Sequence, residues 1–192
     1  MSATLAMGQI PEGSPRPRAR MTGVVYLLYF LTAIGAQLMI GHKLAALGNT
    51  TNEFGVGLYL LLTLLFYSLF KPVNRSLSLL AALFGIAGCV LMGLGLFFPS
   101  APSISPLWFF GPYCLSIGYL VFRSTFLPHI LGVLMAIAGL GWLAFLSPAV
   151  AQHLAPFIEG LGILAEASLM LWLIVMGVNV QRWSEQATTA RR

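Results

Sequence analysis

The stretch GILAEASLMLWLIV, residues 162–175, contains a single ionisable side chain, Glu166, in an otherwise apolar run. Such a run is typical of a helix that crosses a lipid bilayer. An ionised carboxylate at the bilayer centre costs at least about 2.5 kcal/mol on insertion scales. The stretch therefore predicts a membrane protein in which something must shelter a carboxyl group.

The composition of the whole chain supports a membrane environment. Apolar residues make up 58% of the chain and charged residues only 8%, whereas soluble domains carry about 25% charged residues. The net charge of +5 does not indicate nucleic-acid binding, because the basic residues do not form a patch interleaved with aromatic residues. They lie at the ends of apolar runs, where anionic lipid headgroups attract them. We expect the lipid bilayer as the main partner, and the sequence contains no motif that calls for a cofactor.

Six apolar segments predict an all-α membrane protein, a bundle of six transmembrane helices. Continuous apolar runs favour helices over the alternating strands of a barrel. The expected spans cover residues 22–41, 54–70, 76–98, 107–122, 127–147 and 157–180. We therefore expect a disordered cytoplasmic tail over 1–20, a transmembrane domain over 21–183 and a second cytoplasmic tail over 184–192.

The basic residues predict the orientation of the bundle. If both termini are cytoplasmic, only Lys43 among the lysines and arginines falls on the outer side. The cytoplasmic side then carries Arg16, Arg18, Arg20, Lys71, Arg75, Arg123, Arg182, Arg191 and Arg192. This distribution follows the positive-inside rule for short loops.

Glu166 is predicted to lie within a polar layer inside the bundle. Counted from residue 157, it lies nine positions into its span, or about 14 Å at the rise of a helix. Lys43 and Arg123 belong near the interfaces, so neither is placed to pair with it. The same count brings four small polar side chains to nearly the same depth: Thr32, Thr63, Cys89 and Ser116. The plainer alternative is that the hydroxyl groups bond to carbonyl groups of their own helices.

Small residues recur on two of the expected spans and predict close helix packing. The third span carries Ala81, Gly85, Cys89 and Gly93 at intervals of four, and the fourth carries Gly111, Cys114 and Gly118. Such residues let helix backbones approach each other. We expect these two spans to pack against each other.

Two further groups of polar residues are candidates for a metal site and for an anion site. Four residues of metal-ligand type, His42, Glu53, His153 and Glu159, fall near the outer face, but no pair has diagnostic ligand spacing and loop polarity is the plainer account of them, so no metal site is expected. Three cations on the inner side, Lys71, Arg75 and Arg123, are candidates for contact with a lipid headgroup or another anion. In the same inner turn, Pro72 would stop the second span and Asn74 would cap the third.

Three stretches carry a resemblance to a known family. They are FKPVNRSLSLLAALF at 70–84, GYLVFRSTFLPHILGVL at 118–134 and EASLMLWLIVMGVNVQRW at 166–183. Together they resemble the bacterial integral membrane family catalogued as domain of unknown function 4386. The resemblance implies six transmembrane helices in a bacterial inner (plasma) membrane and an acidic residue at the position of Glu166. It implies no activity.

The chain departs from the family pattern at two places. Pro112 and Tyr113 follow FFG where the resemblance leads us to expect a histidine, and His129 follows Leu-Pro where an arginine is expected. Three functions remain open. The bundle could bind or move a small apolar or amphipathic molecule at Glu166, act as a non-catalytic scaffold for a membrane protein partner or a second copy, or use Glu166 as the acid or base of an intramembrane enzyme.

Overall fold

The computed structural model describes residues 14–97 and 104–190, which form seven α-helices and, within those ranges, no β-strand. The helices are α1 (Pro15–Gly41), α2 (Ala45–Phe70), α3 (Arg75–Phe97), α4 (Leu107–Arg123), α5 (His129–Ala144), α6 (Pro148–Val175) and α7 (Val180–Thr189). Four of them, α1, α2, α3 and α6, are long and apolar enough to cross a membrane, and α5 is a shorter apolar helix. The chain is thus all-helical over the described residues, as predicted.

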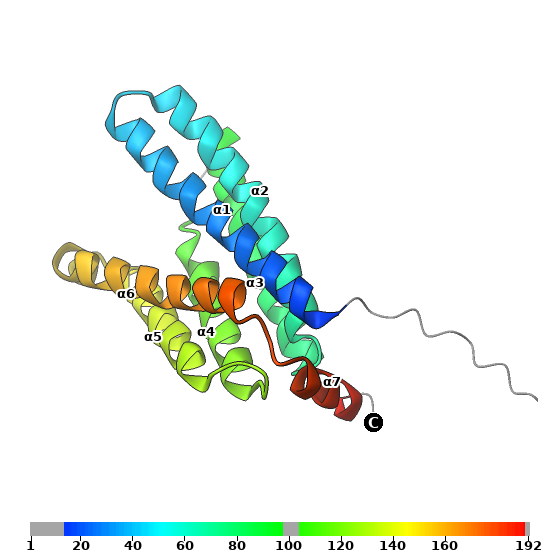
Figure 1. Cartoon of the computed structure of the whole chain (residues 1–192). Coiled ribbons are helices and arrows are strands. Elements are labelled where there is room, and N and C mark those ends of the chain that lie inside the picture. Colours follow the sequence, from blue (N-terminus) through cyan, green and yellow to red (C-terminus); the bar gives the residue numbers. More distant parts are fainter. Residues whose placement is uncertain (1–13, 98–103, 191–192) are drawn as a thin grey trace, which may run out of the picture.

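The first six helices form a closed ring. Each packs against its neighbour in the chain, and α6 returns to pack against α1 (Figure 1). Short connections between antiparallel neighbours produce this order in helical bundles. The contact between α1 and α6, the α1–α6 seam, therefore joins the first helix of the ring to the last.

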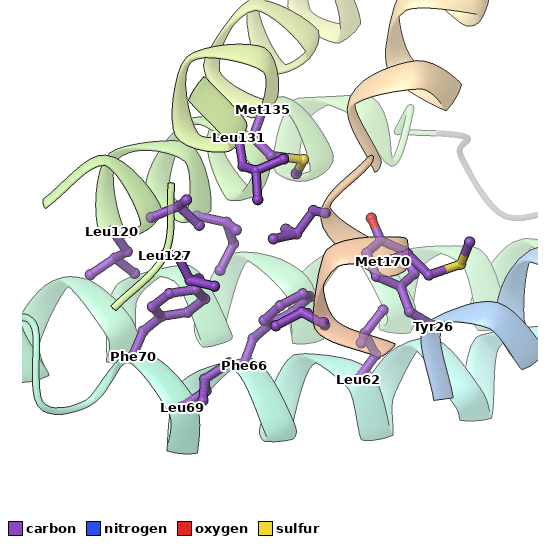
Figure 2. Packing of buried hydrophobic residues seen from close by; sticks show 14 of the residues in the cluster. Tyr26, Leu62, Phe66, Leu69, Phe70, Leu120, Leu127, Leu131, Met135 and Met170 are labelled. Carbon is purple, nitrogen blue, oxygen red and sulfur yellow. The ribbon is translucent and has the colours of Figure 1, made fainter. Parts of the chain in front are cut away.

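The ring is filled by apolar side chains at the end where α7 lies. Phe66 and Phe70 of α2 stack on each other and are almost completely buried. Leu120 of α4 and Met135 of α5 meet them from the other side of the ring (Figure 2). Full burial of an aliphatic or aromatic side chain of this size contributes about 1.5–3 kcal/mol where water is the reference, and where lipid is the reference these side chains stabilise the bundle through close packing instead.

Glycines bring α4 and α5 into backbone contact. A Cβ atom at Gly118 would lie 2.7 Å from the amide nitrogen of Ala136 and 2.8 Å from the carbonyl oxygen of Gly132. A Cβ atom at Gly139 would lie 3.0 Å from the carbonyl oxygen of Gly111. The third and fourth spans, α3 and α4, do pack against each other as expected, but Gly111 and Gly118 face glycines of α5 rather than the small residues of α3.

Three helices begin earlier than the apolar runs suggested. α1 begins at Pro15, so residues 15–20 of the expected tail are helical, with proline at the helix start where its missing N–H costs nothing. α2 begins at Ala45 and α6 at Pro148, each nine residues before the predicted start. Hydropathy marks where a helix enters an apolar phase, and polar turns can extend the helix beyond that point. Residues 1–13 of the expected tail, together with Arg191 and Arg192, lie outside the described residues.

The last expected span ends earlier and is followed by a separate helix. Gly177 adopts a φ of +68°, a conformation that favours glycine, and its N–H donates to the carbonyl oxygen of Trp172. Asn179 then caps α7 by accepting a hydrogen bond of 3.1 Å from the N–H of Arg182. Residues 184–189, predicted as part of a tail, are therefore helical.

Candidate functional site

Glu166 is held at the seam between α1 and α6. It lies in the C-terminal half of α6, and only 5% of it is exposed. The hydroxyl group of Tyr26, on α1, donates a hydrogen bond of 2.8 Å to Oε2 of Glu166. Tyr26 is itself buried, with its ring edge-on to Phe30 and Phe66. The carboxyl group thus has a fixed partner from the opposite end of the chain.

A glycine explains why α1 and α6 come close enough for this bond. A Cβ atom at Gly23 would lie 2.8 Å from the amide nitrogen of Ile174 and 3.1 Å from the carbonyl carbon of Leu173. Gly23 and Tyr26 are three residues apart and share one side of α1. The seam is therefore closed on the side of Glu166 that faces α7.

On the other side of Glu166 the seam opens. The C-terminal half of α1 diverges from the N-terminal half of α6 (Figure 1). A cavity of about 480 Å³ lies between them, lined by Tyr29, Phe30, Ala33, Ile34, Gln37, Leu38, Phe110, Trp142, Ile163 and Glu166. Ile34 and Ile163 are both more than half exposed, so apolar side chains flank the opening. The cavity is a mainly apolar chamber with a carboxyl group in its wall.

A second cavity of about 490 Å³ adjoins the first and lies toward the interior of the ring. The two share four lining residues: Tyr29, Gln37, Phe110 and Trp142. Trp142 packs against the position of Gly162, which lies one helical turn before Glu166 on the same face of α6. Two adjoining cavities therefore lie at the end of the ring away from the apolar packing shown in Figure 2.

The four residues predicted to surround Glu166 do not act as its partners. The hydroxyl groups of Thr32, Thr63 and Ser116 donate to the carbonyl groups of Leu28, Tyr59 and Pro112, each four residues earlier in its own helix. Cys89 lines the second cavity rather than the one with Glu166.

The predicted partners of Glu166 were wrong because α6 begins earlier than the apolar run suggested. The depth of Glu166 was counted from residue 157, but α6 begins at Pro148, about 14 Å earlier along the helix. Glu166 therefore lies 18 residues into α6, and its hydrogen-bond partner is Tyr26 rather than Thr32. The sequence contained one usable signal for this partner, because a buried tyrosine usually finds a hydrogen-bond partner for its hydroxyl group.

Of the three cations proposed for headgroup contact, the structure places two in one cavity and the third outside it. Lys71 and Arg75 line one cavity at the α7 end, together with Arg18, which was assigned to the tail. Arg123 is exposed and is not among the residues that line this cavity. Asn74 accepts a hydrogen bond of 2.9 Å from the N–H of Leu77, so the predicted cap of the third span is confirmed.

The four metal-ligand candidates, His42, Glu53, His153 and Glu159, are all exposed. In the described part of the chain, no three histidine, cysteine or acidic side chains are grouped so that they could hold a metal ion. These four residues are separate surface groups.

We compared the chain with models of known protein families, with curated proteins and with solved structures. The model of the family described as Domain of unknown function (DUF4386) matches residues 103–177. The expected resemblance is confirmed. The DUF4386 match covers α4, α5 and α6 and includes Glu166, whereas Tyr26 and the first resembling stretch at 70–84 lie outside it. No curated protein and no solved structure gives a significant match.

The two departures from the family pattern lie in different surroundings. Tyr113 is buried in α4, and its hydroxyl group has no hydrogen-bond partner among the described residues. His129 is exposed at the start of α5, with its ring 5.2 Å from that of Phe122. Neither residue lines the cavity beside Glu166.

Proposed function

We propose that this protein is an integral protein of a bacterial inner membrane, with six membrane-spanning helices and both termini in the cytoplasm. The four helices of sufficient length and apolarity and the shorter apolar helix α5 support this proposal. The closed order of α1 to α6 supports counting α4 as the remaining span, because it occupies an equivalent place in the ring.

The placement of charge supports the proposed orientation. Arg18, Lys71 and Arg75, from different elements, line one cavity at the end of the ring beside α7. Arg182 of α7 donates a hydrogen bond of 3.3 Å to the carbonyl group of Thr125 in the turn after α4. Basic residues that the positive-inside rule assigns to the cytoplasm thus gather at one end.

The protein binds or moves a small apolar or amphipathic molecule in the cavity between α1 and α6. The observation that carries this proposal is the placement of a buried carboxyl group in the wall of an apolar chamber of about 480 Å³. Small-molecule sites have volumes of about 300–1,000 Å³, are mostly apolar and contain a few polar groups that orient the ligand. The exposed side chains of Ile34 and Ile163 at the opening suit entry from the acyl-chain region of a bilayer.

Glu166 orients the ligand in this proposal. Tyr26 bonds to Oε2, which leaves Oε1 for a hydroxyl, amine or amide donor of the ligand. The amide of Gln37 provides a second polar contact near the opening, and Phe30 and Phe110 receive the apolar part. Because the bond from Tyr26 fixes the carboxyl group, little side-chain freedom is lost when the ligand binds.

The other two candidate functions receive less support. A scaffold that uses the small residues of α3 would need them on an outer surface, whereas Ala81, Gly85 and Cys89 are buried within the ring. An enzyme would need a second reactive group at the cavity. Tyr26, which bonds to Glu166, does not line that cavity, and Tyr29, which does line it, makes no hydrogen bond to Glu166.

The test is to compare small molecules that co-purify with the wild-type protein and with Glu166→Gln, using mass spectrometry of extracts. Glutamine has nearly the same shape and can still accept the bond from Tyr26, so folding should be preserved. Glu159→Gln is the matched control, because Glu159 is an exposed residue of the same helix. We expect at least one compound to be retained by the wild type and Glu159→Gln and depleted in Glu166→Gln. Identical profiles for all three proteins would exclude a binding role for Glu166.

A further inference from the structure

A separate cavity at the α7 end of the ring is lined by several basic side chains. It has a volume of about 620 Å³ and is lined by Arg18, Tyr67, Ser68, Lys71, Pro72, Asn74, Arg75, Trp183, Ala187 and Ala190. Three of these described residues are cations and none is acidic. Lys71 and Arg75 are neighbours at the ends of the turn between α2 and α3, and the packing of α1 against α2 brings Arg18 to them.

The wall that α7 contributes is fixed by specific contacts. The indole N–H of Trp183 donates a buried hydrogen bond of 3.1 Å to the carbonyl oxygen of Leu69 at the end of α2. Gln186 accepts a bond of 3.1 Å from the N–H of Thr125 and donates one of 3.3 Å to the carbonyl oxygen of Arg123. α7 is therefore docked against the bundle by six side-chain hydrogen bonds, these three and three more between Thr125 and either Arg182 or Gln186, and the cavity that it borders is a built part of the fold.

The start of α3 adds to the positive potential of this cavity. Asn74 and Arg75 both line it, and Asn74 caps the helix through the N–H of Leu77. Backbone N–H groups in the first turn of a helix carry a partial positive charge that favours anions. Arginine can present a planar fork of donors to phosphate oxygens, and lysine supplies a compact point charge.

We propose that this cavity binds a phosphate group, either in the headgroup of an anionic phospholipid or in a soluble organic phosphate. Basic pockets between membrane helices on the cytoplasmic side have the chemistry that recognises phosphate headgroups. The site is independent of the one at Glu166. Arg18 and Tyr29 are separated by roughly 16 Å along α1, so the two cavities lie at different depths.

The test uses the purified full chain with two phosphate probes. In one arm, native mass spectrometry compares retention of phosphatidylglycerol and phosphatidylcholine from mixed vesicles. In the other, calorimetry measures binding of glycerol 3-phosphate to protein in a neutral detergent. The variants are Lys71→Gln and Arg75→Gln, with Arg123→Gln as a control of equal charge change outside the cavity. Lys71→Arg preserves the charge.

A phosphate site predicts that Lys71→Gln and Arg75→Gln each weaken binding about five-fold, while Arg123→Gln and Lys71→Arg bind like the wild type. This pattern with phosphatidylglycerol alone identifies a lipid headgroup as the ligand. The same pattern with glycerol phosphate and no lipid preference identifies a soluble phosphate. The proposal is overturned if neither probe binds selectively, or if Arg123→Gln weakens binding as much as the two cavity variants do.

Discussion

The α4–α5 seam and the α1–α6 seam use the same residue type with different results. Along α4 and α5, glycines at two levels of each helix bring the backbones together, with Gly118 against Gly132 and Gly111 against Gly139. Along α1 and α6, Gly23 allows close contact beside Ile174, and beyond Tyr26 the helices diverge around a cavity. Close packing at two levels keeps one seam closed along its length, and close packing at one end leaves room for a site in the other.

The polar chemistry lies where the second seam opens. Tyr26 and Glu166 form their hydrogen bond between the closed part and the cavity. A buried polar group without a partner costs about 1–3 kcal/mol, so this bond also stabilises the contact between the first and the last helix of the ring. The difference between the seams suggests that one serves stability and the other ligand binding.

The largest expected effect comes from adding a methyl group to the closed seam. Gly118→Ala should lower the free energy of unfolding by about 1–3 kcal/mol, because the new Cβ atom would meet backbone atoms of α5 that cannot rotate away. Thermal denaturation of the purified protein in detergent, followed by circular dichroism, measures the change.

Gly57→Ala provides the control for this experiment. Gly57 lies in α2 with nothing within 4 Å of its added Cβ atom. Alanine is the better helix former by up to about 1 kcal/mol, so this variant should be as stable as the wild type or more stable. Equal melting temperatures for Gly118→Ala and Gly57→Ala would mean that α4 and α5 are not in backbone contact.

A smaller effect is expected where the open seam begins. Tyr26→Phe removes the donor to Glu166 while preserving the ring, and should cost about 0.5–1.5 kcal/mol because the nearby cavity gives the carboxyl group access to an alternative partner. Thermal denaturation again provides the measurement. Tyr119→Phe, at a half-exposed site on α4, should leave the melting temperature unchanged. A Tyr26→Phe protein with unaltered stability and unaltered ligand retention would remove the role assigned to this bond.

The smallest effect on stability should come from filling the cavity. Ala33→Leu adds apolar volume beside Glu166, so it should leave stability unchanged or raise it by up to about 1 kcal/mol while preventing ligand retention. The same substitution at the fully buried Ala138 of α5 should instead destabilise the protein through overpacking. If both substitutions destabilise equally in ligand-free protein, the α1–α6 seam is as densely packed as the core.

Much of the fold could be predicted because its signals are local. Continuous apolar runs predict helices, and Asn74 before the third run predicts a cap that the structure contains. The helix starts could not be placed in the same way, since the polar residues between Ala45 and Glu53 and the turns after Pro148 continue a helix without adding to an apolar run. Gly177 and Asn179 were the local signals that separate α6 from α7, the first as a helix stop and the second as a cap.

The candidate site was predicted only in part for a related reason. Glu166 stands out because its residue type conflicts with its surroundings in the chain. Its partner could not be deduced, because Tyr26 meets it through a contact between residues 140 positions apart, and an error in one helix start moved the expected contact to Thr32. The cavity with Lys71 and Arg75 shows the same limit, since Arg18 was assigned to a tail and joins the cavity because α1 begins at Pro15 and packs against α2.

The most direct measurement is a crystal structure, obtained from a lipidic mesophase, of the wild-type protein as it is purified from its host. The account predicts ordered density for a bound molecule in the cavity between α1 and α6, with a polar atom of that molecule within hydrogen-bond distance of Glu166 and the bond from Tyr26 intact. A structure in which α1 and α6 pack closely along their whole length, with no space beside Glu166, would contradict it.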